Sequence, residues 1–245
     1  NLTVTDGEIT AEMLEGFTSL ESFTVGKGVT AIAEGAFKNA VTLSKIAADE
    51  ENTAFKAVNG CLIDVVGKKL ITAANAANVE LPDDGSVTAI GEYAFAGKTF
   101  TSVKIPAAVT AIAENAFEGV TTLTSVKIPV QFTSLIANKE AVTSLTVCGT
   151  AAVTKSALEG YTSLTEIVIA STVSVEAGAF SDISTLTAIS IDGDGSAYTV
   201  KDGCLIHTES KTLVAGIGAA IVPIDGSVTA IGAYAFAGNT TVTEI

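Results

Sequence analysis

Few residues in this chain have the types and spacing that catalysis needs. His207 is the only histidine among 245 residues, so a Ser-His-acid triad or a histidine general base would have to use it. It follows Leu205-Ile206 in a stretch with hairpin character, where a lone histidine is more often a surface or satisfied residue than a catalyst. No P-loop, dinucleotide fingerprint or zinc spacing is present. We therefore expect no enzyme and no cofactor.

Two acidic stretches have the composition of weak cation sites. Asp192–Ser196 begins like a calcium loop, but Ala197 stands at the sixth position instead of glycine, and Gly203 at the twelfth instead of glutamate. A turn is the simpler interpretation. Asp49–Glu51 occupies the same place earlier in the chain. A weak surface cation at either stretch stays open as an alternative, and we expect no dedicated metal site.

The three cysteines do not form a disulfide pattern. Their number is odd, and no CxxC is present. Cys61 and Cys204 occupy matching places in two similar stretches far apart in the chain, so we do not expect them to pair. No His, Lys or Arg motif beside Cys148 indicates an activated thiolate.

The composition limits the classes of partner. Hydrophobic residues are 48% of the chain, and the formal net charge is −14. A nucleic-acid partner requires clustered Lys and Arg, so this acidic balance argues against one. No apolar run reaches the ~20 residues of a membrane helix, so we expect no membrane span in this chain. The chain begins with Asn1, and a signal peptide is neither visible nor excluded.

The elements that would position these residues follow from an internal repeat. Residues 87–108 and 109–130 share apolar positions 22 residues apart, such as Val87 with Val109 and Phe95 with Phe117. This period is typical of leucine-rich repeats, whose units bury apolar residues only by stacking. The chain then predicts one leucine-rich repeat solenoid over 1–245, of about eight coils. Residues 228–245 stop inside a strand, so we expect the natural protein to continue.

A larger unit is duplicated within the repeat. Residues 9–25 align with 153–169, and 29–48 with 173–191. In both copies, the second of these segments is followed by a similar insertion, near 54–74 and 197–216. The turn pairs Asn59-Gly60 and Asp202-Gly203 lie between apolar runs and predict hairpins, each extended into a small antiparallel meander. Residues 132–147 are a degenerate copy without the Ala-Phe pair.

The strand of each repeat alternates buried and outward residues. Leu123, Val126 and Ile128 are spaced as LxxLxL, and Pro129 ends the strand. Recurrence in register favours a core column over an aromatic ligand platform for five phenylalanines: Phe37, Phe95, Phe117, Phe180 and Phe236. The expected architecture is right-handed and β-rich, with little helix and a concave parallel sheet.

The motif VTAIGxYAFxGxxxLTSVKIP closely resembles the BspA-like, treponemal-type leucine-rich repeats of bacterial surface proteins. The insertions resemble that family's hairpin, matched at Tyr198, Asp202-Gly203 and Leu205. The chain departs from the family at the frequent repeat cysteine, which Lys98 and Val120 replace. The resemblance implies a secreted or cell-surface protein that binds host or neighbouring-cell molecules.

Three functions remain to be weighed, and we favour the first. It is a binding or adhesion module that recognises a protein or glycan, such as a host matrix or serum protein, through the concave face. The second is a passive structural spacer in a larger surface protein, and the third, an enzyme, lacks a converging acid, base or nucleophile. The candidate ligand-binding residues alternate with buried strand positions: Ser102, Lys104, Ser125, Lys127, Ser144, Thr146 and Glu166. Lys104 and Lys127 are expected to be neighbours and to form a local basic spot, for which plain strand solubility is the alternative.

Overall fold

The structure, a computed structural model, describes residues 1–242. Contacts divide the chain into two compact units, Asn1–Leu123 (unit 1) and Thr124–Ile245 (unit 2), and each is described by itself. The single solenoid of about eight coils stays a prediction. The strand expected at the end of repeat 228–245 falls on residues 243–245, outside the described residues.

Both units consist of short strands with little helix, as the repeat predicts. The elements of unit 1 are β1 (Leu2–Ile9), α1 (Ala11–Leu14), β2 (Ser22–Ile32), β3 (Lys45–Ala48), β4 (Phe55–Val58), β5 (Cys61–Asp64), β6 (Lys69–Ala73), β7 (Asn78–Glu80), β8 (Ala89–Ile90), β9 (Ser102–Lys104) and β10 (Ala111–Ile112). The elements of unit 2 are β11 (Ser125–Pro129), the 3₁₀ turns η1 (Val130–Leu135) and η2 (Lys139–Ala141), β12 (Ser144–Cys148), the 3₁₀ turn η3 (Ser156–Leu158), β13 (Glu166–Ala170), β14 (Ala188–Asp192), β15 (Tyr198–Lys201), β16 (Cys204–His207), β17 (Thr212–Gly216) and β18 (Ala230–Ile231). No described helix is long and apolar enough to span a membrane.

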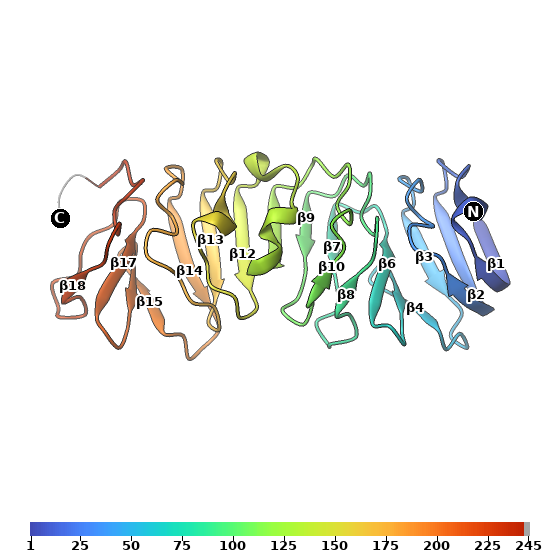
Figure 1. The fold of residues 1–245 in the computed structure, drawn as a ribbon, viewed down its shortest axis with the longest axis horizontal. Coiled ribbons are helices and arrows are strands. Elements are labelled where there is room, and N and C mark those ends of the chain that lie inside the picture. The colour runs from blue at the N-terminus through green and yellow to red at the C-terminus, as the bar shows by residue number, and fades with distance from the viewer. Residues whose placement is uncertain (243–245) are drawn as a thin grey trace. The chain divides into compact units, whose positions relative to one another are not determined.

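The LxxLxL strands form parallel ladders in which equivalent residues stand side by side. In unit 2, β11, β12, β13 and β14 pair in that order, the last three labelled in Figure 1, and the buried residues Leu145, Ile167 and Ile189 are in register. In unit 1, β2 pairs with β1 and β3, and β7 pairs with β9. Alternation along each strand sends one set of side chains into the core and the other outward. The parallel sheet is thus confirmed.

Each coil returns through a second, shorter ladder. In unit 1, β8 pairs in parallel with β10, so that Ile90 stands beside Ile112. In unit 2 the corresponding contacts are the bridge between Val153 and Val175 and the pairing of β17 with β18. Two ladders on opposite sides of the coil enclose the apolar residues, which is how a repeat of about 22 residues buries its core.

The two insertions are antiparallel meanders, as predicted. Strands β4, β5 and β6 pair in sequence order, and so do β15, β16 and β17. The first turn of each has two residues with positive φ: 51° and 75° at Asn59 and Gly60, and the same values at Asp202 and Gly203. These angles match the type I′ turn that the two sequences favour. The meanders are not separate protrusions, because the last strand of each also joins the second ladder, β6 beside β8 and β17 beside β18.

Aromatic residues fill the core of unit 1. The rings of Phe95 and Phe117 stack with centroids 4.8 Å apart, and Phe23 meets Phe37 edge-on at 5.0 Å. Phe180 is also buried in unit 2. Phe236 is only half-buried, although it packs against the core cluster that contains Ile206 and Leu213, so at this position the prediction of a core phenylalanine is confirmed only in part.

The degenerate repeat 132–147 uses 3₁₀ turns in place of an Ala-Phe turn. There η1 and η2 connect β11 to β12. Tyr161, which is 1% exposed, donates its hydroxyl hydrogen to the carbonyl of Thr133 at 2.8 Å. A tyrosine from the next coil thus satisfies a carbonyl of the irregular segment.

Candidate functional site

The outward side chains of the parallel strands form the candidate binding surface, which we call the strand face. In unit 2, the ladder places Ser125 beside Ser144, and Ser144 beside Glu166. The next outward row places Lys127 beside Thr146. Five of the seven residues named from the sequence therefore share one surface in unit 2. Their role in ligand binding, and the expected concavity of the face, stay predictions.

This surface is polar, and most of its side chains are half-buried. Ser125, Lys127, Ser144 and Thr146 are half-buried, and Glu166 is exposed. The hydroxyl of Ser144 donates a hydrogen bond to Glu166 Oε2 at 3.3 Å. Short hydroxyl-bearing side chains can both donate and accept hydrogen bonds, so the strand face has the chemistry of a contact surface rather than of a catalytic centre.

In unit 1, the strand face contains an ion pair that the sequence did not reveal. Lys104 is exposed, and its Nζ lies 3.4 Å from Glu80 Oε2 on the paired strand β7. Glu80 was missed because β7 has only three residues and lies outside the recognisable repeats. The alternation Asn78-Val79-Glu80, with only Val79 buried, was the available signal. Glu80 reduces the expected basic spot at Lys104. Lys104 belongs to unit 1 and Lys127 to unit 2, so the expectation that these two lysines are neighbours stays a prediction.

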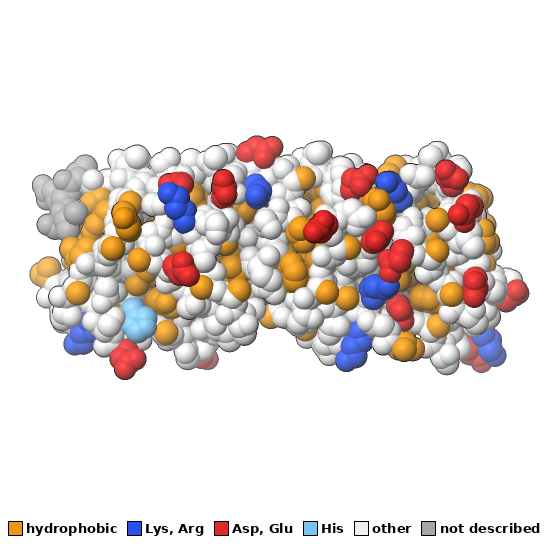
Figure 2. Space-filling view, viewed as in Figure 1, with side chains coloured by type: hydrophobic (Ala, Val, Ile, Leu, Met, Phe, Trp, Pro, Cys, Tyr) orange, Lys and Arg blue, Asp and Glu red, His pale blue; other side chains and the backbone are white. Residues whose placement is uncertain are grey.

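Charged side chains elsewhere also occur in pairs. On the face seen in Figure 2, acidic and basic groups lie scattered among polar atoms and single hydrophobic residues. Lys38 lies 3.3 Å from Glu118, and Lys155 lies 2.9 Å from Asp182. The face shown has no continuous basic patch that would suit an anionic polymer.

His207 ends strand β16 in the second meander. Its Nδ1 accepts a hydrogen bond from the Ser210 backbone N–H at 3.3 Å and lies 3.1 Å from the Ser210 hydroxyl. The ring meets Tyr198 edge-on, with centroids 5.4 Å apart. A catalytic triad needs an acid that orients the histidine, and no described carboxylate bonds to this ring. The structure therefore places His207 at a turn, half-buried at the surface.

The two acidic stretches form turns. Asp49 Oδ1 accepts the Glu51 backbone N–H at 2.9 Å, and Glu51 pairs with Lys27 at 2.6 Å. Asp192 is the last residue of β14, and a bend follows it. Within residues 1–242, no three His, Cys, Asp or Glu side chains are grouped as a metal site requires.

The cysteines are buried thiols. Cys61, Cys148 and Cys204 all lie in the core. Burial raises the pKa of the Cys61 thiol to about 12. The pKa of the Cys204 thiol is also raised, mainly by burial and to a smaller extent by the nearby Asp202 carboxylate. Since the thiolate is the nucleophile, neither of these two cysteines is activated.

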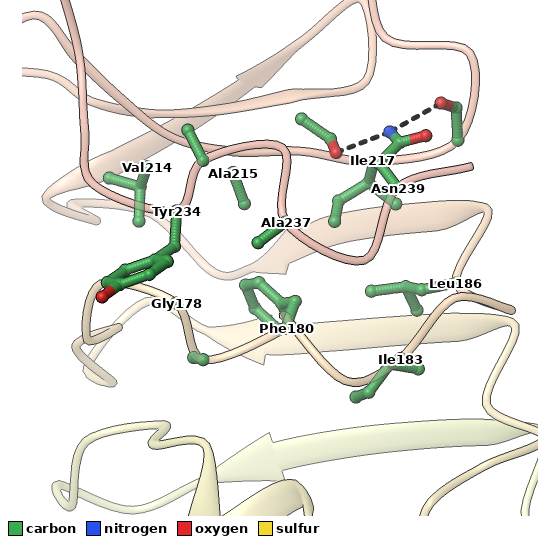
Figure 3. A pocket seen from close by; sticks show the side chains of 14 residues that line it. Gly178, Phe180, Ile183, Leu186, Val214, Ala215, Ile217, Tyr234, Ala237 and Asn239 are labelled. Carbon is green, nitrogen blue, oxygen red and sulfur yellow. Dashed lines mark hydrogen bonds between the residues drawn. The ribbon is translucent and has the colours of Figure 1, made fainter. Parts of the chain in front are cut away.

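A crevice in unit 2 is almost filled by side chains. Its volume is about 10 Å³, room for roughly one water molecule. In the close view of Figure 3, Phe180, Ile183 and Leu186 line one side, and Tyr234 lies near Gly178. Asn239 closes the other end by donating to the carbonyls of Gly216 and Gly218 at 2.8 and 2.9 Å. The crevice is a packed junction between coils and not a ligand site.

One family model and several solved structures are similar to this chain. The family model described as BspA type leucine rich repeat region matches residues 3–59 and 88–210, in six copies. No curated protein matches the chain. Among solved structures, a leucine-rich repeat protein of Eubacterium ventriosum is 19% identical over 93% of this chain and 61% of its own, with a TM-score of 0.45.

Two further solved structures are similar at the same level. A leucine rich cell surface protein of Faecalibacterium prausnitzii is 24% identical over 72% of this chain and 49% of its own, with a TM-score of 0.47. The pneumococcal vaccine antigen PcpA is 15% identical over 92% of this chain and 56% of its own, with a TM-score of 0.42. The chain thus spans about half to three fifths of the length of each of these three proteins.

Proposed function

Because the chain belongs to the BspA-type leucine-rich repeat family, we propose that it is a non-enzymatic binding or adhesion module. Its partner is a protein or glycan outside the cell, and the strand face is the surface that contacts it. The observation that supports this is the ladder of unit 2, where outward hydroxyl and charged side chains stand in register on a parallel sheet. Repeat proteins commonly bind through such a continuous strand surface.

The proposed location is the bacterial cell surface or the extracellular medium. It rests on the family resemblance of the repeat motif. A passive spacer between an anchor and another domain is the alternative, and it requires no contact at the strand face.

Capture of candidate partners by strand-face variants tests the proposal. We would immobilise the protein and measure binding of serum and extracellular-matrix proteins, and of a glycan array, by interferometry. The test variant is Ser144→Arg with Thr146→Arg, which adds bulk and charge in the middle of the unit 2 ladder. The matched control is Ser174→Arg with Ser184→Arg, two exposed serines of the same unit that lie off the parallel strands.

We expect the test variant to weaken capture at least about tenfold, while the control binds like the unchanged protein. Equal loss in both variants, or capture that survives the test variant, would reject the strand face as the contact surface. No capture of any partner would favour the spacer.

A further inference from the structure

A second hollow in unit 2 lies away from the strand face, beside the second meander. Its volume is about 240 Å³. The residues that decide its chemistry are Ala177, Tyr198, His207, Ser210, Thr212 and Val214. They come from the coil before the meander, from strands β15 to β17, and, for Ser210, from the turn between β16 and β17. Gly232 and Ala233 of the following coil complete the lining, so the pocket forms where the insertion packs between two coils.

The aromatic wall of this pocket is fixed by the backbone. The Tyr198 hydroxyl accepts the Val175 backbone N–H at 3.0 Å and donates to the Val175 carbonyl at 3.4 Å. The Tyr198 and His207 rings meet at an interplanar angle of 83°. Two anchored rings form a preformed surface, so a ligand would not have to order them on binding.

The polar wall combines donors and acceptors. His207 Nδ1 accepts the Ser210 N–H, so in the neutral ring the hydrogen is on Nε2, and no described residue accepts it. The Ser210 hydroxyl donates to Thr212 Oγ1 at 2.9 Å, Thr212 donates to the Ser210 carbonyl at 3.4 Å, and both hydroxyl oxygens can still accept. Figure 2 shows the histidine side chain at the molecular surface, where a ligand can reach it.

The first copy of the duplicated unit has an ion pair at the matching place. Glu34 and Lys69 correspond to Ala177 and Thr212, and their side chains bond to each other. A Cβ added at Gly91 would lie 3.2 Å from the Glu34 carboxylate, so the pair lies directly over that backbone. In the second copy the pair is replaced by a methyl group and a short hydroxyl, and the matching glycine, Gly232, lines the pocket. The ion pair that covers the glycine in the first copy is therefore absent beside the hollow in the second.

We propose that this pocket binds one uncharged sugar ring, the terminal residue of a glycan. No charged side chain lines it, so a charged ligand would enter without compensation. Its volume is below the range of about 300–1,000 Å³ that drug-sized ligands fill, which suits a single ring. A pyranose has an apolar C–H face and a rim of hydroxyls, matching the aromatic wall and the Ser210, Thr212 and His207 groups. The site is separate from the strand face and does not depend on the partner proposed for it.

The single histidine provides a direct readout of binding. With ¹⁵N-labelled protein, the imidazole resonances of His207 report on this pocket alone. The probes are the methyl glycosides of glucose, galactose, mannose and N-acetylglucosamine, titrated to about 50 mM. We expect at least one glycoside to shift the His207 signals saturably. Absence of a saturable shift with all four would overturn the proposal, and so would binding of free reducing sugars but not of their methyl glycosides.

Transplanting the ion pair of the first copy should close the pocket. Ala177→Glu with Thr212→Lys is expected to weaken the glycoside at least about tenfold. The matched control, Glu34→Ala with Lys69→Thr, makes the reverse exchange in unit 1 and should leave the His207 titration unchanged. If the transplanted variant does not fold, Ser210→Ala removes only one hydroxyl and is expected to weaken binding severalfold. Titrations unaffected by these pocket changes would overturn the proposal, as would tighter binding of galacturonate or N-acetylneuraminate than of the neutral glycosides.

Discussion

The meanders of unit 1 and unit 2 have matching backbones and different chemistry at equivalent positions. Their first turns have equal φ angles, and the second turns both contain a lysine of positive φ, 48° at Lys68 and 51° at Lys211. The side chains at several equivalent positions in and beside the meanders differ. Asp64 corresponds to His207, the Glu34–Lys69 pair to Ala177 and Thr212, and Lys98 to Asn239. The duplication thus preserved the backbone while changing what the surface offers.

The comparison shows which residues the fold requires. The positive-φ glycines of the first turns, Gly60 and Gly203, and the buried strand residues are the same or similar in both copies, because a change there would strain the backbone or leave a cavity. Positions at the edge of the meander are free to change, because water can replace a lost contact. The first copy has the Glu34–Lys69 ion pair at these positions, and the second copy has the hollow lined by Ala177 and Thr212.

The largest difference between the copies is expected in the aromatic core. Phe95 has 0% exposure and stacks on Phe117, so Phe95→Ala should cost ~3–5 kcal/mol, the usual range for a buried phenylalanine. Phe236→Ala should cost less because that side chain is half-buried. Urea unfolding, with hydrogen exchange to assign each unit, measures both. Equal costs would show that the two copies are packed alike.

The next prediction concerns the buried lysine of the first copy. Lys98 is 1% exposed, and its Nζ donates to the Ala40 carbonyl at 3.0 Å. Burial lowers its pKa from 10.5 to about 8. The unfolded chain then binds the proton more tightly, so the stability of unit 1 should rise by about 3 kcal/mol between pH 8 and 10.5.

Replacing this lysine should remove that pH dependence. Lys98→Met is expected to stabilise unit 1 at pH 7, by up to about 3 kcal/mol, with the gain shrinking to near zero at pH 10.5. Asn239→Met in the second copy removes two hydrogen bonds that the side chain donates and three that it accepts, and it should destabilise unit 2 with no such pH dependence. Chemical unfolding across pH 7–10.5 compares the two. A stability gain from Lys98→Met that does not change with pH would contradict the buried-charge explanation.

A smaller effect is expected at the second turn of each meander. Asp64 Oδ1 accepts the backbone N–H groups of Val66 and Gly67 at 3.0 and 2.9 Å, whereas His207 accepts only that of Ser210. Asp64→Ala should cost about 1–2 kcal/mol and His207→Ala less than about 1 kcal/mol. Thermal unfolding of the single variants provides the measurement. The opposite order would mean that the histidine contributes more than its turn contact.

The smallest effect concerns two tyrosines with left-handed backbone. Tyr93 and Tyr234 have φ of 56° and 61°, where non-glycine residues are strained. Lys38 Nζ lies 4.0 Å from the centre of the Tyr93 ring, while Tyr234 is 70% exposed. Replacement by glycine relieves strain at both sites, but only Tyr93→Gly loses a cation–π contact. We expect Tyr93→Gly to be less stable than Tyr234→Gly by about 1 kcal/mol, measured by urea unfolding. Identical effects would show that the Lys38 contact contributes nothing.

The candidate binding surface was predictable in part. Alternation located the outward strand positions, because the side-chain period of a strand is two wherever it pairs. The Lys104–Glu80 pair was not predictable, because three alternating residues are a weak strand signal and the partner of β7 is chosen by the stacking of coils. The pocket beside Tyr198 was not predictable either, although the exchange of Glu34 and Lys69 for Ala177 and Thr212 is visible once the two copies are aligned.

The sequence by itself determined the repeat, the duplication, the parallel strands and the meander turns. These depend on periodic burial and on local turn chemistry, which are properties of neighbouring residues. Tertiary structure alone decided that Phe236 is half-buried, that Lys98 lies in the core, and that the third strand of each meander joins the second ladder. Those outcomes depend on contacts made in one coil only, such as that of Lys98 with Ala40, and a period shared by all the coils does not encode them.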